Sequence, residues 1–155
     1  MAKFLEYLAE AQKIVSIIDH MFFVSYPLVQ DKKVLIKIIL ESKKAISNCI
    51  NAILQYEYLF KRITLFKDPA LNMKTFILKS APRYSISDSE IRLIAELFEV
   101  VRLHEKSPME FSREKNLVIL SEDMHPKVIS LDKTREFLLL SKNILQKTKQ
   151  NIKNW

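Results

Sequence analysis

An arginine and a histidine close together in the chain are the first residues that could do chemistry. The stretch EVVRLHEK places Arg102 two residues before His104. Such a pair would suit phosphodiester cleavage, in which a histidine moves a proton and an arginine stabilises the phosphate charge. On one helix, however, two residues separate the side chains by about 200°. We therefore interpret His104 as a half-buried residue near a helix C-terminus, where a cation is mildly favoured.

Metal and nucleophile sites are poorly supported. A di-iron site in a helical bundle needs Glu-x-x-His pairs on two helices, and the one such motif here, Glu122 to His125, falls in a predicted turn. Glu57 lies within an apolar stretch, LQYEYLF, which indicates partial burial. Cys49 falls on a predicted core stripe, where a free cysteine acts as a small hydrophobe. No serine lies in a glycine-flanked elbow, so we predict no metal and no acyl-transfer chemistry.

The composition excludes several classes of nucleotide-binding protein. Average usage would put about 11 glycines in a chain of this length, and the 155 residues contain none. Loops that cradle phosphates need glycine, because their backbone approaches the phosphate closely and adopts positive φ. A Walker-type NTPase, a Rossmann fold and a kinase glycine loop are therefore excluded, and no nucleotide cofactor is expected. Tight two-residue hairpins of the Asn-Gly kind are excluded as well.

The charge favours a polyanionic partner. Twenty-five Lys and Arg oppose 18 Asp and Glu, for a net charge of +7 and a pI near 9.4. The cations concentrate in residues 31–67 and in the last predicted helix, which would form a basic stripe if the two adjoin. The candidate RNA contacts are Lys44, Arg62, Lys147 and Lys149 for phosphates, with Arg83 and Tyr84 as a loop contact that could stack on a base. The alternative is a solvated helix face for the lysines and a loop anchor for Tyr84.

Apolar spacings of four and three residues predict a mainly α fold. The expected helices cover about 3–24, 31–66, 69–79, 88–106 and 132–152, with a kink or early stop in the second near 48–51 left open. Asp31, Asp68 and the Ser87/Glu90 capping box begin three of them, and Pro27 and Pro82 are expected to end two. Two short β-favouring runs around a turn predict a hairpin at about 117–131. We thus expect one domain, 1–155, a four- or five-helix antiparallel bundle with a short β-hairpin before the last helix.

Cysteine usage and hydropathy bear on the compartment. Cys49 is the one cysteine, so no disulfide can form within the chain, and a reducing, cytoplasmic setting is the default. No apolar run approaches the ~20 residues that a membrane-spanning helix needs. We predict a cytoplasmic protein with no membrane partner.

The pattern resembles the HEPN group of small helical-bundle domains, many of them partners or toxins in RNA-directed systems. The likeness lies in two long antiparallel helices, EYLAEAQKIVSIIDHMFFVSYPLV and ISNCINAILQYEYLFKRI, with a later capped helix and a C-terminal one. Active members carry an Arg-x4-6-His motif. The corresponding positions before His20, His104 and His125 hold no arginine; they are Lys13-Ile14-Val15, Leu97-Phe98-Glu99 and Val118-Ile119-Leu120. The resemblance therefore implies the fold without the catalytic motif.

The leading interpretation is a non-catalytic interaction module that contacts RNA, or an RNA-associated protein, through a basic helical face. One alternative is a divergent metal-independent ribonuclease acting as a dimer, with His104 and Arg102, or an arginine from another helix, as its catalytic residues. A second alternative is a homodimeric assembly protein without nucleic-acid contact.

Overall fold

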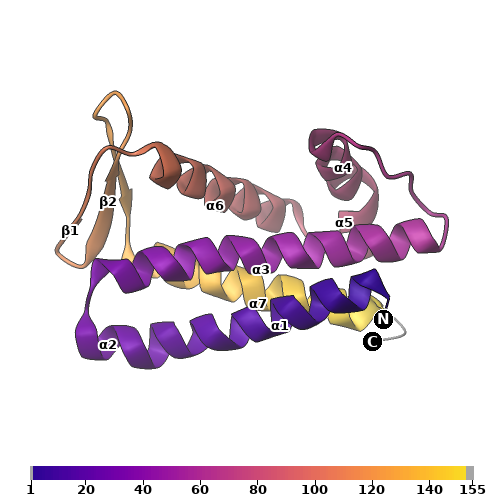
Figure 1. Cartoon of the computed structure of the whole chain (residues 1–155), viewed down its shortest axis with the longest axis horizontal. Coiled ribbons are helices and arrows are strands. Elements are labelled where there is room, and N and C mark those ends of the chain that lie inside the picture. Colours follow the sequence, from indigo (N-terminus) through magenta and orange to yellow (C-terminus); the bar gives the residue numbers. More distant parts are fainter. Residues whose placement is uncertain (1, 153–155) are drawn as a thin grey trace.

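The computed structural model describes residues 2–152 and is mainly helical (Figure 1). The helices are α1 (Lys3–His20), α2 (Tyr26–Val29), α3 (Lys32–Leu59), α4 (Pro69–Thr75), α5 (Ala81–Arg83), α6 (Asp88–Lys106) and α7 (Leu131–Asn151). Two π-helical turns, Met21–Ser25 and Phe76–Ser80, join α1 to α2 and α4 to α5. The strands are β1 (Glu110–Arg113), β2 (Asn116–Leu120) and β3 (Pro126–Ile129).

The long helices form a bundle around α3 and α7. Helices α1 and α3 run antiparallel side by side, and α7 packs against both (Figure 1). Helix α6 packs against α3 and α7, and the small sheet lies at the end of the bundle where α6 ends. Helices α4 and α5 lie over the C-terminal half of α3. The predicted mainly α bundle with a short β element before the last helix is confirmed.

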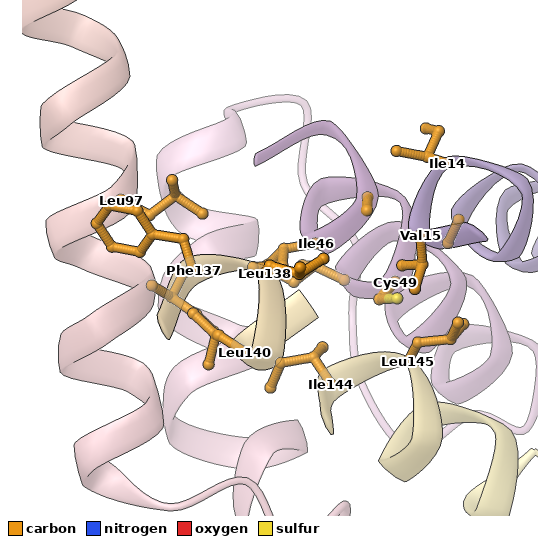
Figure 2. Packing of buried hydrophobic residues seen from close by; sticks show 14 of the residues in the cluster. Ile14, Val15, Ile46, Cys49, Leu97, Phe137, Leu138, Leu140, Ile144 and Leu145 are labelled. Atoms are coloured by element: carbon orange, nitrogen blue, oxygen red, sulfur yellow. The ribbon is translucent and has the colours of Figure 1, made fainter. Parts of the chain in front are cut away.

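The apolar stripes predicted from spacing form the core. In α1 the stripe of Phe4, Leu8, Ala11, Val15 and Ile18 is buried. Figure 2 shows side chains of α1, α3, α6 and α7 packed together, with the Cys49 sulfur among them. Cys49 is fully buried, as expected for a small hydrophobe.

The prolines at 27 and 82 do not end their helices as predicted. A proline in a helix lacks an N–H donor, and its ring clashes with the carbonyl four residues earlier. Here a π-helical turn precedes each proline: the Tyr26 N–H donates to the Met21 carbonyl, and the Ala81 N–H to the Phe76 carbonyl. This widening accommodates the ring. The first helical run therefore continues to Val29 instead of ending near Val24.

Helix α3 is continuous but ends earlier than predicted. It runs from Lys32 to Leu59 with no break at 48–51, and it stops seven residues before the expected Phe66. Lys61 adopts a left-handed conformation, with φ of 59°. The Lys61 N–H donates to the Tyr58 carbonyl (2.9 Å) and the Arg62 N–H to the Glu57 carbonyl (2.9 Å). This Schellman motif is normally closed by glycine.

The predicted hairpin is part of a three-stranded antiparallel sheet of order β1-β2-β3. Strand β1 was not predicted. A two-residue turn, Glu114–Lys115, connects it to β2, and both residues have positive φ, 51° and 68°. Such a turn favours Asn-Gly, so excluding tight hairpins from the lack of glycine was wrong at this position.

Candidate nucleic-acid interface

The Arg102 and His104 side chains diverge, as the helical spacing predicts. The Arg102 guanidinium lies on the exposed surface of α6 and donates from Nε to the Glu99 carboxylate (2.8 Å). The half-buried His104 instead contacts Glu110 at the start of β1, with 2.7 Å between Nδ1 and Oε2. The two residues are not brought together on one surface, and no phosphate could contact both.

The His104 ring borders a small, mainly apolar cavity between α3, α6 and the sheet. The cavity is lined by Ile36, Ile39, Leu40, Val100, His104, Glu110, Leu117 and Ile119. None of these is a nucleophile, and the Lys32 ammonium donates to the Glu110 backbone carbonyl (2.8 Å). The histidine–glutamate contact therefore joins α6 to β1.

The predicted basic stripe along α3 and α7 does not form as expected. The two helices pack together, but the Lys147 ammonium forms an ion pair with Glu90 and donates to the Ser85 carbonyl (2.7 Å). Lys142 forms an ion pair with Asp19. Lys149 is half-buried, whereas Lys44 is exposed on α3. Much of the positive charge of α7 is therefore neutralised within the protein.

Two other predicted contacts, Arg62 and Arg83, meet at one buried carboxylate. Arg62 Nη1 lies 2.8 Å from Glu57 Oε2, and Arg83 Nε lies 3.3 Å from Glu57 Oε1. The Tyr84 hydroxyl donates to Glu57 Oε2 over 3.3 Å. Only 2% of the Glu57 side chain is exposed, against 38% for Arg62 and 54% for Arg83. Both oxygens of the Glu57 carboxylate thus have partners within the protein, while both guanidinium groups are partly exposed to solvent. We call Arg62 and Arg83 the arginine pair.

Two Schellman turns position the pair. The turn that ends α3 brings Arg62 back over Glu57, which lies one helical turn earlier. The turn that ends α5 is built alike: Ser85 has φ of 59°, and the Ile86 N–H donates to the Ala81 carbonyl (2.9 Å). Both turns use a residue other than glycine at the left-handed position. Each arginine therefore belongs to a hydrogen-bonded helix end rather than to a loose loop.

The structure corrects the interpretation of Tyr84 as an exposed ring. The Tyr84 side chain is only 1% exposed, so it cannot stack on a base. It is instead a loop anchor, which was the alternative interpretation of this residue. Burial and the neighbouring Glu57 carboxylate raise the pKa of Tyr84 well above its ordinary value. The hydroxyl therefore stays protonated and remains a donor to Glu57.

The segment that carries the arginine pair is also strongly basic. Residues 57–83, the basic segment, contain six Lys and Arg against two acids, a net charge of +4. All six cations are exposed: Lys61, Arg62, Lys67, Lys74, Lys79 and Arg83. Of the two acids, Glu57 is buried and Asp68 accepts the Ala70 N–H (2.9 Å) as the N-cap of α4. Both carboxylates of this segment therefore have partners within the protein, and the six exposed cations outnumber them.

The exposure of three aromatic side chains was not predicted from the sequence. Tyr58, Phe60 and Phe66 are 52%, 46% and 44% exposed, at the end of α3 and in the loop that follows. The helix predicted through residue 66 placed Phe60 on its buried stripe. An earlier stop would have exposed these rings, but the sequence offers no glycine to mark that stop.

Comparison with known proteins gives no relative: no family model, no curated protein and no solved structure matches this chain. Within residues 2–152 no helix has the length and apolarity to cross a bilayer. The same residues contain no group of three His, Cys, Asp or Glu side chains arranged to hold a metal ion.

Proposed function

We propose that this protein is a non-catalytic interaction module that binds RNA through the basic segment, with the arginine pair as its central phosphate contact. The observation that carries the proposal is the meeting of Arg62 and Arg83 on the buried Glu57. A single carboxylate orients two guanidinium groups and offsets only one of their charges.

The donors of the arginine pair favour phosphate as the ligand. A guanidinium has five N–H donors in a planar fork that matches phosphate oxygens. Arg62 uses Nη1 and Arg83 uses Nε on Glu57, which leaves donors on both groups for a ligand. Because Glu57 already orients the side chains, less rotamer entropy is lost on binding.

The surrounding charges support a polyanion rather than a single phosphate. Lys61, Lys67 and Lys79 flank the pair in the sequence and are exposed. Each phosphate neutralised by a cation releases counterions, so binding should weaken steeply with salt.

The test is a titration of labelled single-stranded RNA by fluorescence anisotropy at low and at physiological salt. We expect affinity to fall by tenfold or more between the two conditions. Lys67→Glu and Lys79→Glu should weaken binding and flatten the salt dependence. Lys13→Glu, on the exposed face of α1, changes the net charge equally and should have a much smaller effect.

Absence of binding at low salt, or equal losses in all three variants, would contradict the proposal. In that case the homodimer alternative is measured directly by sedimentation velocity. The RNA recovered from the same samples tests the ribonuclease alternative. A His104-dependent ribonuclease would cleave this RNA, and His104→Ala would abolish the cleavage.

A further inference from the structure

We propose that the ligand of the basic segment is unpaired RNA, whose bases stack on the exposed ring of Phe60. This inference rests on the proposed function and deepens it, since phosphate contacts alone do not separate single strands from duplexes. It arises from a different observation: the exposure of the Phe60 ring beside Arg62 of the arginine pair.

Phe60 is held in a defined orientation at the C-cap of α3. Its ring centroid lies 4.7 Å from that of the buried Tyr56, at an interplanar angle of 52°. The Arg62 guanidinium carbon lies 5.4 Å from the Phe60 centroid. Arg62 thus contacts both Glu57 and Phe60, which places an exposed ring directly beside a phosphate contact.

Phe66 adds an exposed ring in the loop that follows α3. Tyr58 is half exposed as well, but two residues separate it from Phe60, which places the two side chains about 200° apart around the helix. The loop at Phe66 is held in place: its N–H donates to the Asn72 side-chain oxygen (2.8 Å), and its carbonyl accepts from the Asn72 amide (2.9 Å). Exposed aromatic rings interleaved with cations are typical of surfaces that bind single strands.

The aromatic rings select unpaired bases because a duplex hides the base faces. In an A-form helix each base is stacked on its neighbours, and proteins contact mainly the backbone and the 2′-hydroxyls. A single strand can turn a base out onto an aromatic side chain, and such stacking tolerates any base. The expected ligand class is therefore single-stranded RNA with little sequence preference.

The experiment compares three probes on the whole protein: labelled oligouridylate, an RNA duplex of equal length, and inorganic polyphosphate, which has the charge without the bases. The ring variant is Phe60→Leu. Phe23→Leu is the matched control, because Phe23 is also 46% exposed, with Lys142 and Arg135 over its ring at 5.4 and 5.9 Å. It precedes α2, at the opposite end of the bundle (Figure 1). Circular dichroism melts verify that each variant folds.

We expect oligouridylate to bind more tightly than the duplex. Phe60→Leu should weaken oligouridylate binding by about fivefold or more, with an unchanged salt slope and unchanged polyphosphate affinity. Phe23→Leu should bind all three probes as the wild type does.

Two results overturn the inference and are distinguishable. Equal, salt-dependent binding of single strand and duplex, with Phe60→Leu behaving as Phe23→Leu does, removes the stacking role and leaves the proposed function intact. Failure of every probe to bind at low salt, polyphosphate included, removes the proposed function and this inference with it.

Discussion

Glu57 is a buried carboxylate whose partners come from two helix ends. A buried charge is costly unless it is paired and hydrogen-bonded, and Glu57 meets Arg62, Arg83 and the Tyr84 hydroxyl. Because the arginines are partly exposed, the Coulomb attraction is screened, and the buried Tyr84 contact is the part most sensitive to loss.

The first prediction concerns the removal of this carboxylate. Glu57→Ala should lower the free energy of unfolding by about 3 kcal/mol, since it empties a buried site and leaves the Tyr84 hydroxyl without its acceptor. Urea denaturation followed by circular dichroism measures the change. The control is Glu99→Ala, which removes the exposed partner of Arg102 and should leave stability almost unchanged. Equal effects of the two substitutions would contradict the anchoring role of Glu57.

The second prediction concerns pH and the buried thiol of Cys49. Burial raises its pKa to about 12, whereas an unfolded thiol has a pKa of about 8.5. Above the unfolded pKa the unfolded state loses the proton and the folded state keeps it, so stability falls as pH rises. Between about pH 7.5 and 9.5 the wild type should lose about 1 kcal/mol more than Cys49→Ala.

The comparison uses urea denaturation of both proteins at the two pH values. Parallel losses in wild type and Cys49→Ala would show that the thiol does not titrate on unfolding in this range. The window stops near pH 9.5 because above it the unfolded tyrosines begin to titrate, and Tyr84, whose pKa is also raised by burial, adds to the slope.

At the scale of elements, local signals predicted the helix starts well. The side chains of Asp31 and Asp68 cap α3 and α4, and both halves of the Ser87/Glu90 capping box are present. These motifs depend on residues within one turn, so the sequence contains all the information. The buried stripes of α1 and α7 follow from periodicity for the same reason.

Helix ends and turns were harder to predict because the chain lacks glycine. Lys61 and Ser85 close Schellman motifs, and Glu114 and Lys115 form a tight turn, although none of these residue types favours positive φ. The meeting of Arg62 with Arg83 depends on two such turns and on a contact between distant segments. The apolar neighbours of Glu57 in the sequence indicated its burial, but nothing in the sequence identified Arg62, Arg83 and Tyr84 as its partners.

The third prediction concerns one of these turns. Ser85→Gly should raise the free energy of unfolding by about 1 kcal/mol, because glycine adopts the left-handed conformation without a Cβ penalty. Gln12→Gly, at an exposed position inside α1, should lower it by about 1 kcal/mol. Thermal melts of the two variants measure the difference. A Ser85→Gly variant that is less stable than the wild type would contradict the argument.

At the scale of the whole molecule, stability is unevenly distributed. The bundle of α1, α3, α6 and α7 supplies most of the core, whereas none of the seven residues of α4 is buried. In the π-helical turn that follows α4, Phe76 is fully buried and packs in the core. Segments with few buried contacts open locally at low free-energy cost.

The fourth prediction is that α4 exchanges its amide hydrogens by local opening. Native-state hydrogen exchange should give α4 amides a far lower opening free energy than the amides around Ile46 and Ile53 in α3. The α3 amides should approach the global free energy of unfolding. Equal protection of α4 and α3 would show that α4 is part of the same cooperative unit.

The weak attachment of α4 has a kinetic consequence for ligand capture. The arginine pair is anchored to α3 and α5 through Glu57, so opening of α4 leaves it in place. An opened α4, together with the preceding Lys67, is then a tethered cationic loop that also carries Lys74, with both ends fixed. Such a loop sweeps a larger volume than the closed helix, and if the basic segment binds RNA as proposed, it would accelerate encounters with a distant strand. Release of the strand would still depend on the anchored arginine pair. The loop would therefore influence the association rate, and the arginine pair the dissociation rate.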